Sequence, residues 1–546
     1  MRREVADGHD AHEPLIRGSE EDLHHHDGDP GPTPNTSIRS AAPIVKFLTL
    51  SAGISGLLFG FDTGVISSTL VSIGSDLSGR PLTTTHKSLI TAVTSLLALI
   101  SAPFTGVFAD KYGRKSVILV PALLFIVGAL VQAIAQHVSV MVAGRALVGA
   151  AVGVASGAVP LYITELAPAE LRGRLVTVQS LFITGGQVVA YLIGWGFAFL
   201  PHGWRWMVGS GAVPGLLQLF LIAWMPETPR WLLQTGQDGE ARSVLNEVYA
   251  GLPEHDRALI VQNVLVSVQA EITAEDKAHS RSDSASGSSR FRDATKDLFA
   301  VPGNRRALII ACMLQGLQQL CGFNSLMYFS ATIFSLVGFT SPIGTSSSVA
   351  VTNFALTLVA FNLIDTVGRR NILLRSIPFM VLGLLLCAVA FSFINMGDAS
   401  AAGDVYNPNA SSVWSIVLLI SMIFFVASYA IGLGCVPWQQ SELFPLRVRS
   451  LGSGLATATN WSSNFIIGMT FLPMMGILGA SVTFTFYAVV CFVGWFLIWK
   501  IYPETAGLEL EDIGELLKDG FGVQRSVREF QDRQRTKVVQ STVAEQ

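Results

Sequence analysis

Charged residues are scarce in this sequence. Asp, Glu, Lys and Arg make up 14% of the 546 residues, whereas a soluble domain averages about 25%. Half of the residues are hydrophobic, which excludes an ordinary water-soluble protein of this length. The formal net charge of −3 gives no sign of a nucleic-acid partner, and we expect none.

Cysteine motifs and a cleavable signal peptide are missing as well. The five cysteines lie in apolar runs without the spacing of a metal site or a disulfide framework. Residues 1–43 are mostly polar, and we expect a disordered cytoplasmic tail there. The apolar runs carry no nucleophile–base set and no metal cluster. We therefore expect no enzymatic activity, no cofactor and no resident metal.

The sequence does have long apolar runs. Windows of about 20 apolar residues, the length that crosses a bilayer, predict an all-α membrane protein with twelve spans. They are expected near residues 44–70, 88–108, 116–136, 139–164, 174–199, 206–225, 306–337, 346–366, 371–395, 413–438, 450–476 and 481–501.

The positive charges in the loops predict the orientation of the spans. Lys and Arg gather in the loops after spans two, four, eight and ten, which places these loops and both termini in the cytoplasm. Asn409 then lies in an exterior loop and is the one plausible glycosylation acceptor.

An internal repeat divides the chain into two halves. The motif DKYGRK at 110–115 recurs as DTVGRR at 365–370, and PET at 226–228 recurs at 503–505. A duplicated bundle with a site between the repeats is the layout of a rocking transporter. The predicted units are a six-helix bundle over 44–225, a cytoplasmic linker with short helices over 226–305, a second six-helix bundle over 306–502 and a cytoplasmic tail over 503–546.

Four side-chain amides crowd one segment of the seventh span, QGLQQLCGFN at 315–324. Amides can hold neighbouring helices together, but four amides without a charge favour a ligand made of hydroxyls, since each amide both donates and accepts. On a straight helix Asn324 falls roughly 140° from Gln319. A break near Gly322 would bring it to the same face, and broken helices mark transport sites.

Two charges, Asp62 and Arg145, lie within spans rather than at their ends. Both are predicted in the outer half of the membrane at a similar depth, where buried charges usually pair. A static structural ion pair is one interpretation. We favour a proton-coupling site, because burial favours the neutral acid whereas a close guanidinium favours the carboxylate.

Acids and bases also repeat at the cytoplasmic ends of the spans. They could serve only as orientation charges and helix caps. Acids at repeated spacings favour a gate, in which pairs across helix ends hold the cytoplasmic side shut. The predicted gate residues are Asp110, Arg114, Glu165 and Arg172 in the first half and Asp365, Arg369, Glu442 and Arg449 in the second.

These motifs resemble the sugar porter family of the major facilitator superfamily over about residues 44–517. The likeness is carried by DKYGRK, GRALVGA, PETPRW, QQLCGFN, VGRR, VPWQQSELFP and YPET. LVTVQSLFITGGQVVAY, VTNFALTLVAF and YPETAGLELE are similar to the fungal proton-coupled myo-inositol transporters of that family. The resemblance implies the major facilitator fold, with twelve transmembrane helices in two bundles.

The resemblance also implies roles for single residues. Asp62 matches the proton-linked aspartate of family symporters, and Arg145 matches its partner. Ala430 stands where animal hexose carriers have a glutamate, which weakens a glucose assignment. The implied substrate-binding residues are Gln179, Gln318, Gln319, Asn324, Asn353, Asn460 and the site tryptophan Trp438.

We therefore expect a secondary active transporter that imports myo-inositol with a proton by alternating access. Its partners would be a small neutral polyol or sugar, a proton and the lipid bilayer, with the plasma membrane as its location. A hexose or fructose transporter is the alternative in the same class. A sensor that binds without transport is a third, but the tail after Pro503 has only about 40 residues, too few for a long signalling segment.

Overall fold

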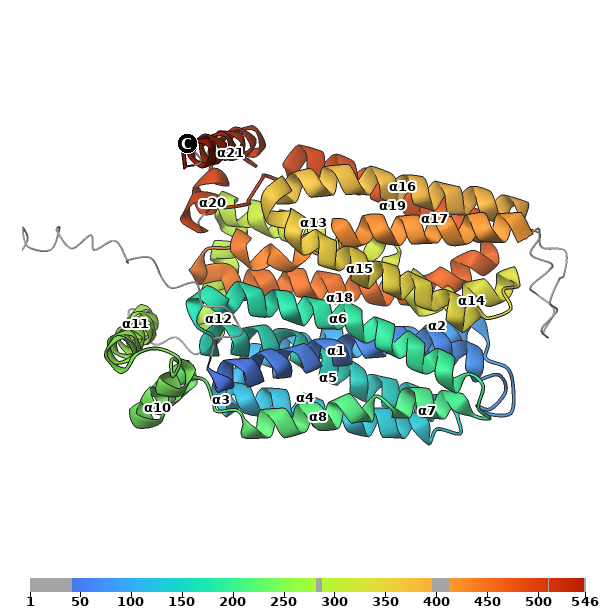
Figure 1. Cartoon of the computed structure of the whole chain (residues 1–546), viewed down its shortest axis with the longest axis horizontal. Helices are drawn as coiled ribbons and strands as arrows, with labels where there is room; N and C mark the ends of the chain where they lie inside the picture. The colour runs from blue at the N-terminus through green and yellow to red at the C-terminus, as the bar shows by residue number, and fades with distance from the viewer. Residues whose placement is uncertain (1–41, 281–286, 395–411, 509, 545–546) are drawn as a thin grey trace, which may run out of the picture.

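The computed structural model of the chain describes residues 42–280, 287–394, 412–508 and 510–544. Within these ranges the secondary structure is helical, without a strand. Figure 1 shows the long helices lying side by side in one elongated bundle. The predicted tail over 1–43 lies almost wholly outside the described residues, and so does Asn409.

The first half crosses the bundle six times. Its helices are α1 Pro43–Ser72, then α2 Thr84–Ser101, η1 Ala102–Phe104 and α3 Thr105–Tyr112 as one crossing, α4 Arg114–Ala133, α5 Val138–Leu166, α6 Ala169–Phe197, and α7 Gly203–Gly209 with α8 Ala212–Trp224 as one crossing.

The second half also crosses six times. Its helices are α13 Pro302–Leu320 with α14 Phe323–Val337 as one crossing, α15 Pro342–Val367, α16 Arg369–Phe393, α17 Ser412–Ile431, α18 Leu446–Ile477 and α19 Ala480–Ile501, with the 3₁₀ helix η2 Val436–Leu443 between α17 and α18.

Eleven of these crossings are long and apolar enough to span a membrane, counted over the described residues. The twelfth is α18, which has 32 residues and packs against α2 and α13. Its middle turns carry Thr457, Asn460 and Asn464, which lower its hydropathy. The predicted all-α fold with twelve transmembrane helices in two bundles is confirmed.

The tenth span is shorter than the predicted range of 413–438, because α17 ends at Ile431. The N–H groups of Gly432 and Gly434 both turn back to the Tyr429 carbonyl, at 3.1 and 2.8 Å. Pro437 has no N–H group and cannot extend an α-helix from this turn. The chain therefore leaves the helix before the predicted end and continues as η2.

The seventh crossing is broken where the sequence predicts it. Gly322 lies between α13 and α14 and has a φ of +87°, a left-handed conformation that suits glycine. A Cβ on Gly322 would lie 2.9 Å from the ring of Tyr487. The neighbouring Cys321 and Phe323 are buried, so the interrupted backbone is enclosed by protein rather than by lipid.

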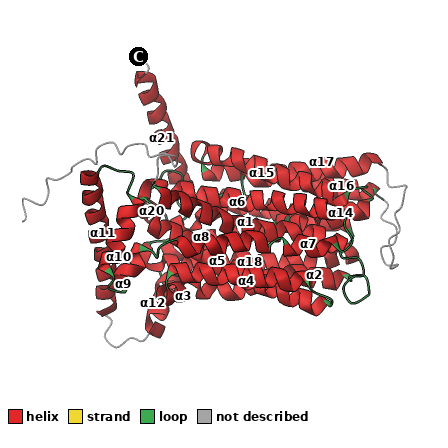
Figure 2. Ribbon diagram, turned by 60° about the horizontal axis from the view of Figure 1, so that its bottom comes forward, coloured by secondary structure: helices red, strands yellow, loops and turns green. Residues whose placement is uncertain are grey.

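The helices that lie outside the twelve crossings gather at one end of the bundle. Figures 1 and 2 both place α10 and α11 at the same end as α20 and α21. This is the end that the positive charges assign to the cytoplasm. The helices between the two halves are α9 Pro229–Gln234, α10 Asp238–Val248, α11 Glu254–Ser280 and α12 Gly287–Ala300, and those of the tail are α20 Leu510–Leu516 and α21 Val523–Ala544.

The tail is tied to the second bundle. Arg306 at the start of α13 donates hydrogen bonds to the carbonyls of Leu517 and Lys518, each at 2.7 Å. The N–H group of Glu504 donates to the buried hydroxyl of Ser526 at 3.0 Å. These contacts hold α20 and α21 against the cytoplasmic end of the helices.

The two halves meet along the pairs α1–α14, α2–α18 and α6–α15. Gly468 lets α18 approach α2 closely, since a Cβ there would lie 3.3 Å from that of Ala92. The surfaces between these pairs are where a central cavity can form.

We predict that Gly322→Ala lowers the free energy of unfolding by roughly 1–3 kcal/mol, because alanine would have to adopt the left-handed conformation beside Tyr487. Thermal unfolding of the purified protein in detergent measures the effect. Gly454→Ala is the matched control, because Gly454 lies within α18 and a Cβ there would meet nothing within 4 Å. Equal melting temperatures for the two variants would contradict the prediction.

Candidate functional site

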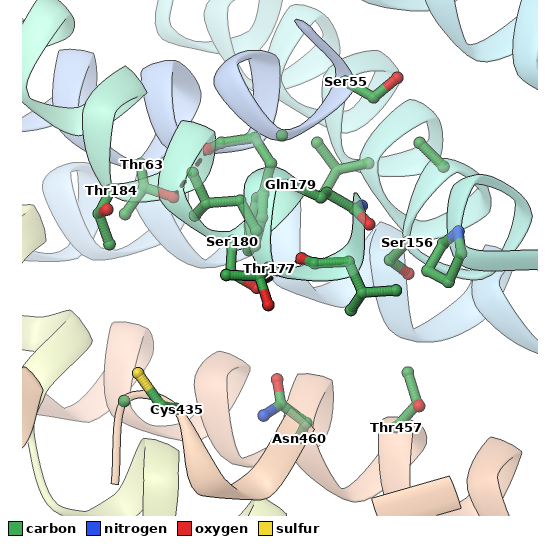
Figure 3. Close-up of a pocket in the computed structure, with 18 of the residues that line it drawn as sticks. Ser55, Thr63, Ser156, Thr177, Gln179, Ser180, Thr184, Cys435, Thr457 and Asn460 are labelled. Carbon is green, nitrogen blue, oxygen red and sulfur yellow. Dashed lines mark hydrogen bonds between the residues drawn. The ribbon is translucent and has the colours of Figure 1, made fainter. Parts of the chain in front are cut away.

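A cavity of about 1130 Å³ lies between the two halves. Figure 3 shows Gln179 and Ser180 of α6 facing Asn460 and Thr457 of α18 across it. The central part of the wall is neutral. The charged residues of the wall all lie at the cytoplasmic ends of the helices, and they are Arg172, Arg174, Arg369 and Glu442.

Asn460 is the centre of the predicted amide cluster. Its Nδ2 donates to Oε1 of Gln315 at 2.6 Å and of Gln318 at 3.0 Å, and its Oδ1 accepts from Nε2 of Gln319 at 3.1 Å. Asn324, the second residue of α14, donates to Oε1 of Gln319. The break between α13 and α14 thus brings Asn324 to the glutamines.

Two of the glutamines also hold the turn that follows α17. Gln315 Nε2 donates to the carbonyl of Pro437 at 2.9 Å, and Gln318 Nε2 donates to the carbonyl of Leu433 at 3.0 Å. Both carbonyls lie in the stretch where α17 has ended. These amides therefore do hold helices together, and they line the cavity at the same time.

The first half contributes the amides of Gln179 and Gln187 on α6. Gln187 Oε1 accepts from Nδ2 of Asn353 on α15 at 2.9 Å, which joins the two halves. Gln179 lines the cavity and makes no side-chain hydrogen bond within the described part of the chain, so its amide is available to a ligand. The side chain of Trp438 lies outside the described part.

Hydroxyl groups complete the wall, and the sequence reasoning did not single them out. Thr63, Ser180, Thr184 and Thr457 are among them (Figure 3). Ser180 and Thr184 are four positions apart on α6, and Gln187 follows three positions later. This helical spacing of polar residues on one face of an apolar span is the signal that could have found them.

The cavity wall can bind a neutral, hydroxyl-rich molecule reversibly. Amides and hydroxyls supply both donors and acceptors. Phe59 and Trp461 line the same wall with ring centroids 5.7 Å apart, and aromatic faces pack against C–H groups. Among the described residues, no three His, Cys, Asp or Glu side chains lie together as a metal site requires.

Asp62 of α1 and Arg145 of α5 form a buried ion pair, with exposed fractions of 6% and 1%. Arg145 Nη1 donates to Asp62 Oδ1, and its Nε donates to the carbonyl of Ile90 on α2 at 3.2 Å. Neither side chain is part of the cavity wall. The ion pair is therefore separate from the amides that face the cavity.

Contacts between α1, α6 and α14 seal the exterior end of the interface. Ser67 Oγ accepts from the N–H group of Ala331 at 3.1 Å and lies 3.2 Å from Ser330 Oγ. The hydroxyl of Tyr191 donates to the carbonyl of Met327. The cavity wall reaches the cytoplasmic helix ends instead, so the cavity is closed to the exterior and open towards the cytoplasm.

Ion-pair networks lie at the cytoplasmic end of both halves. In the first half, Arg114 contacts Glu165 at 2.9 Å and Asp110 at 3.1 Å. In the second half, Arg369 pairs with Glu442. Each of these pairs joins helices of one half, in a form whose cytoplasmic side is open. The predicted gate role concerns the other form, in which the cytoplasmic ends of the two halves meet. That role stays a prediction.

The glutamate of each PET repeat caps the N-terminus of the helix that carries the arginine of one network. Glu227 accepts a hydrogen bond from the N–H group of Arg114 at 2.9 Å, and Glu504 accepts one from that of Arg369 at 2.8 Å. The glycine before each capped helix has a positive φ, +88° and +92°. Burial raises the pKa of Glu227, and the backbone N–H groups oppose that shift. The repeated PET was the signal for these caps.

Arg172 and Arg449 occupy matching places in the repeat. Each donates through Nε to the carbonyl five positions earlier, of Ala167 and of Phe444, at 3.2 Å in both halves. The side chain of Asp365 lies outside the described part.

Residues 48–517 match the sugar (and other) transporter family. The chain belongs to this family. The carrier is 44% identical to Myo-inositol transporter 2 of Schizosaccharomyces pombe, over 87% of its own length and 82% of that relative. It is 43% identical to Myo-inositol transporter 1 of Candida albicans, over 90% and 86% of the two chains.

Solved structures agree with the family. The inward-open conformation of the xylose transporter XylE from E. coli matches with a TM-score of 0.67 at 26% identity, over 87% of the carrier and 99% of that chain. The major facilitator superfamily proton:xylose symporter XylE bound to 6-bromo-6-deoxy-D-glucose gives the same score and identity, over 86% and 98% of the chains. The carrier is thus a multi-pass membrane transporter with the major facilitator fold.

We predict that Asn460→Ala weakens the binding of a neutral polyol by roughly 1–3 kcal/mol, because three glutamine side chains lose their shared partner. Equilibrium binding to the purified carrier measures the change. Asn362→Ala is the matched control, because Asn362 is exposed on α15 and bonds to the Leu358 carbonyl of its own helix. Unchanged affinity in Asn460→Ala would leave the cluster with a packing role only.

We predict that Glu442→Gln slows transport about tenfold while exterior binding persists, because Arg369 loses the charge that neutralises it and the populations of the two forms shift. Transport rates and exterior affinity are measured at equal surface expression. Glu515→Gln is the control, since it makes the same change at an exposed pair with Lys518. Loss of exterior binding at an unchanged balance of forms would argue against a gate.

Proposed function

We propose that the carrier imports myo-inositol together with a proton across the plasma membrane. The observation that carries this proposal is the likeness to the fungal relatives. Proteins named as myo-inositol transporters from three yeasts are 42–44% identical to the carrier over 87–90% of its length. Identity at this level, spread over nearly all of the membrane region, supports a shared substrate.

The chemistry of the cavity fits a cyclic polyol. A ring of hydroxyls offers donors and acceptors on every side. The amides of Gln179, Gln319 and Asn324 can donate hydrogen bonds to such groups and accept hydrogen bonds from them. Phe59 and Trp461 offer faces for the C–H groups of the ring. A charged substrate would find no counter-ion in the central wall.

The buried ion pair supports proton coupling. When Asp62 takes a proton, it becomes neutral and releases Arg145, and when the pair re-forms the proton leaves. A membrane potential of about 100 mV contributes roughly 2.3 kcal/mol per charge and one pH unit about 1.36 kcal/mol, which together support roughly 500-fold accumulation of a neutral polyol.

The competing proposal is transport of a monosaccharide, and the likeness to the solved xylose transporter supports it. A carrier of monosaccharides would share the fold of the xylose transporter, which matches at 26% identity. The fungal relatives match at much higher identity, and we therefore prefer the polyol.

Cells without carriers of their own that express this chain should accumulate labelled myo-inositol, with excess glucose competing poorly. Addition of myo-inositol should move protons inward. Asp62→Asn should lose uphill accumulation but keep exchange down a gradient, because an amide cannot take up the proton. Uptake and external pH are recorded together at equal surface expression.

Asp238→Asn makes the same chemical change at an exposed position of α10 and serves as the control. Hexose uptake without myo-inositol uptake would overturn the substrate. Proton movement that persists in Asp62→Asn would place the proton elsewhere. Polyol uptake without proton movement in the unaltered chain would make the carrier a uniporter and the ion pair a structural one.

A further inference from the structure

Asn464 joins the two halves at a point outside the cavity. It lies on α18 and is buried, with an exposed fraction of 1%. Its Oδ1 accepts one hydrogen bond from the hydroxyl of Ser95 on α2 and another from the hydroxyl of Tyr328 on α14, each at 3.1 Å. One side-chain oxygen therefore connects a helix of the first half with two helices of the second.

We call Asn464 with Ser95 and Tyr328 the junction. On its α2 side, hydrogen bonds connect it with the residues of the ion pair. Ser95 follows Thr94, whose hydroxyl donates to the backbone carbonyl of Arg145 at 3.4 Å. The guanidinium of Arg145 donates in turn to the carbonyl of Ile90, one turn earlier on α2. Arg145 thus holds the stretch of α2 that carries Ser95 at two points.

On its α14 side, the junction shares a helix with residues of the exterior seal. The helix that carries Tyr328 also carries Met327, Ser330 and Ala331, which make the contacts with Tyr191 and Ser67. A movement of Tyr328 with α14 would therefore act on the contacts that close the exterior end.

The junction is also close to the charges themselves. Tyr328 lies within range of the charges of both Asp62 and Arg145. In the described part of the chain, Arg145 of α5 is the charged group that contacts Asp62, through the buried ion pair.

The junction does not face the substrate. Ser95, Tyr328 and Asn464 are not among the residues that line the cavity. Asn460, one turn earlier on α18, does face it (Figure 3). A change at Asn464 can therefore alter the link between the halves without removing a group that contacts the polyol.

We infer that Asn464 is a positioning residue that couples the protonation of Asp62 to the exterior seal. The inference rests on the proposed symport. In the form that is open to the exterior, a proton from the exterior water binds the Asp62 carboxylate, and Arg145 loses its counter-ion and shifts. The stretch of α2 that Arg145 holds moves with it, and Ser95 transmits this movement through Asn464 to Tyr328 and α14. With the polyol bound the exterior seal closes, and release of the same proton to the cytoplasm then restores the ion pair of the described form.

The test uses the full-length carrier in proteoliposomes, with labelled myo-inositol as the probe. Exchange is measured at equal pH on both sides, and accumulation is measured under a pH gradient of about one unit, which drives about tenfold accumulation in a coupled carrier. Asn464→Leu should keep exchange at the rate of the unaltered chain and accumulate almost no polyol above equilibrium. Exchange does not depend on the coupling, whereas accumulation does.

Tyr328→Phe keeps the ring and removes one of the two hydrogen bonds, so it should show a smaller loss of accumulation and serves if Asn464→Leu folds poorly. Thr470→Val is the matched control, because Thr470 is exposed on the same helix and bonds only to the Ile466 carbonyl of that helix in the described part.

Full accumulation in both Asn464→Leu and Tyr328→Phe would overturn the coupling role. Equal losses of exchange and accumulation would overturn it too, because they would indicate a general packing role. An unaltered carrier that exchanges myo-inositol without proton-driven accumulation would defeat the proposed symport, and this inference with it. An unaltered carrier that binds no polyol would defeat the substrate proposal instead.

Discussion

The absence of water inside the membrane is the constraint on which the rest of this structure depends. Polar groups that leave a regular helix have to find partners within the protein. The chain leaves regular helix after α13 and after α17, and these two places are adjacent. Gln315 and Gln318 bond to carbonyls of Pro437 and Leu433, where α17 has ended. The same amides face the cavity, so the groups that stabilise the broken backbone also form the polar wall.

The charged side chains described above lie away from the cavity centre, in two layers near the two ends of the bundle. The Asp62–Arg145 pair lies towards the sealed exterior end, and the networks of Arg114 and Arg369 lie at the cytoplasmic end. A neutral molecule can then cross a neutral cavity, and under the proposed symport the proton would bind at a different place, the Asp62–Arg145 pair. Because the ion pair does not line the cavity, the proposed coupling between proton and polyol would act through contacts between helices.

The cytoplasmic networks are built separately in each half. Glu227 caps α4 in the first half, and Glu504 caps α16 in the second. Each cap comes from the segment that leaves its bundle, the linker in one case and the tail in the other. Each network therefore lies within its own half in this form, and the predicted gate contacts between the halves would form only when the two cytoplasmic ends meet.

Hydropathy determined the twelve crossings in the sequence itself, because lipid sets the length and composition that each crossing needs. Helix geometry likewise placed the break at Gly322, and span direction placed Asp62 at the depth of Arg145. Only the tertiary structure decided that Asn460 bonds to the glutamines of α13 and that Gln315 and Gln318 bond to the turn after α17. It also decided which hydroxyls of α6 face α18. These features depend on which helices lie opposite one another, and side chains from distant parts of the chain meet only after the bundles have packed.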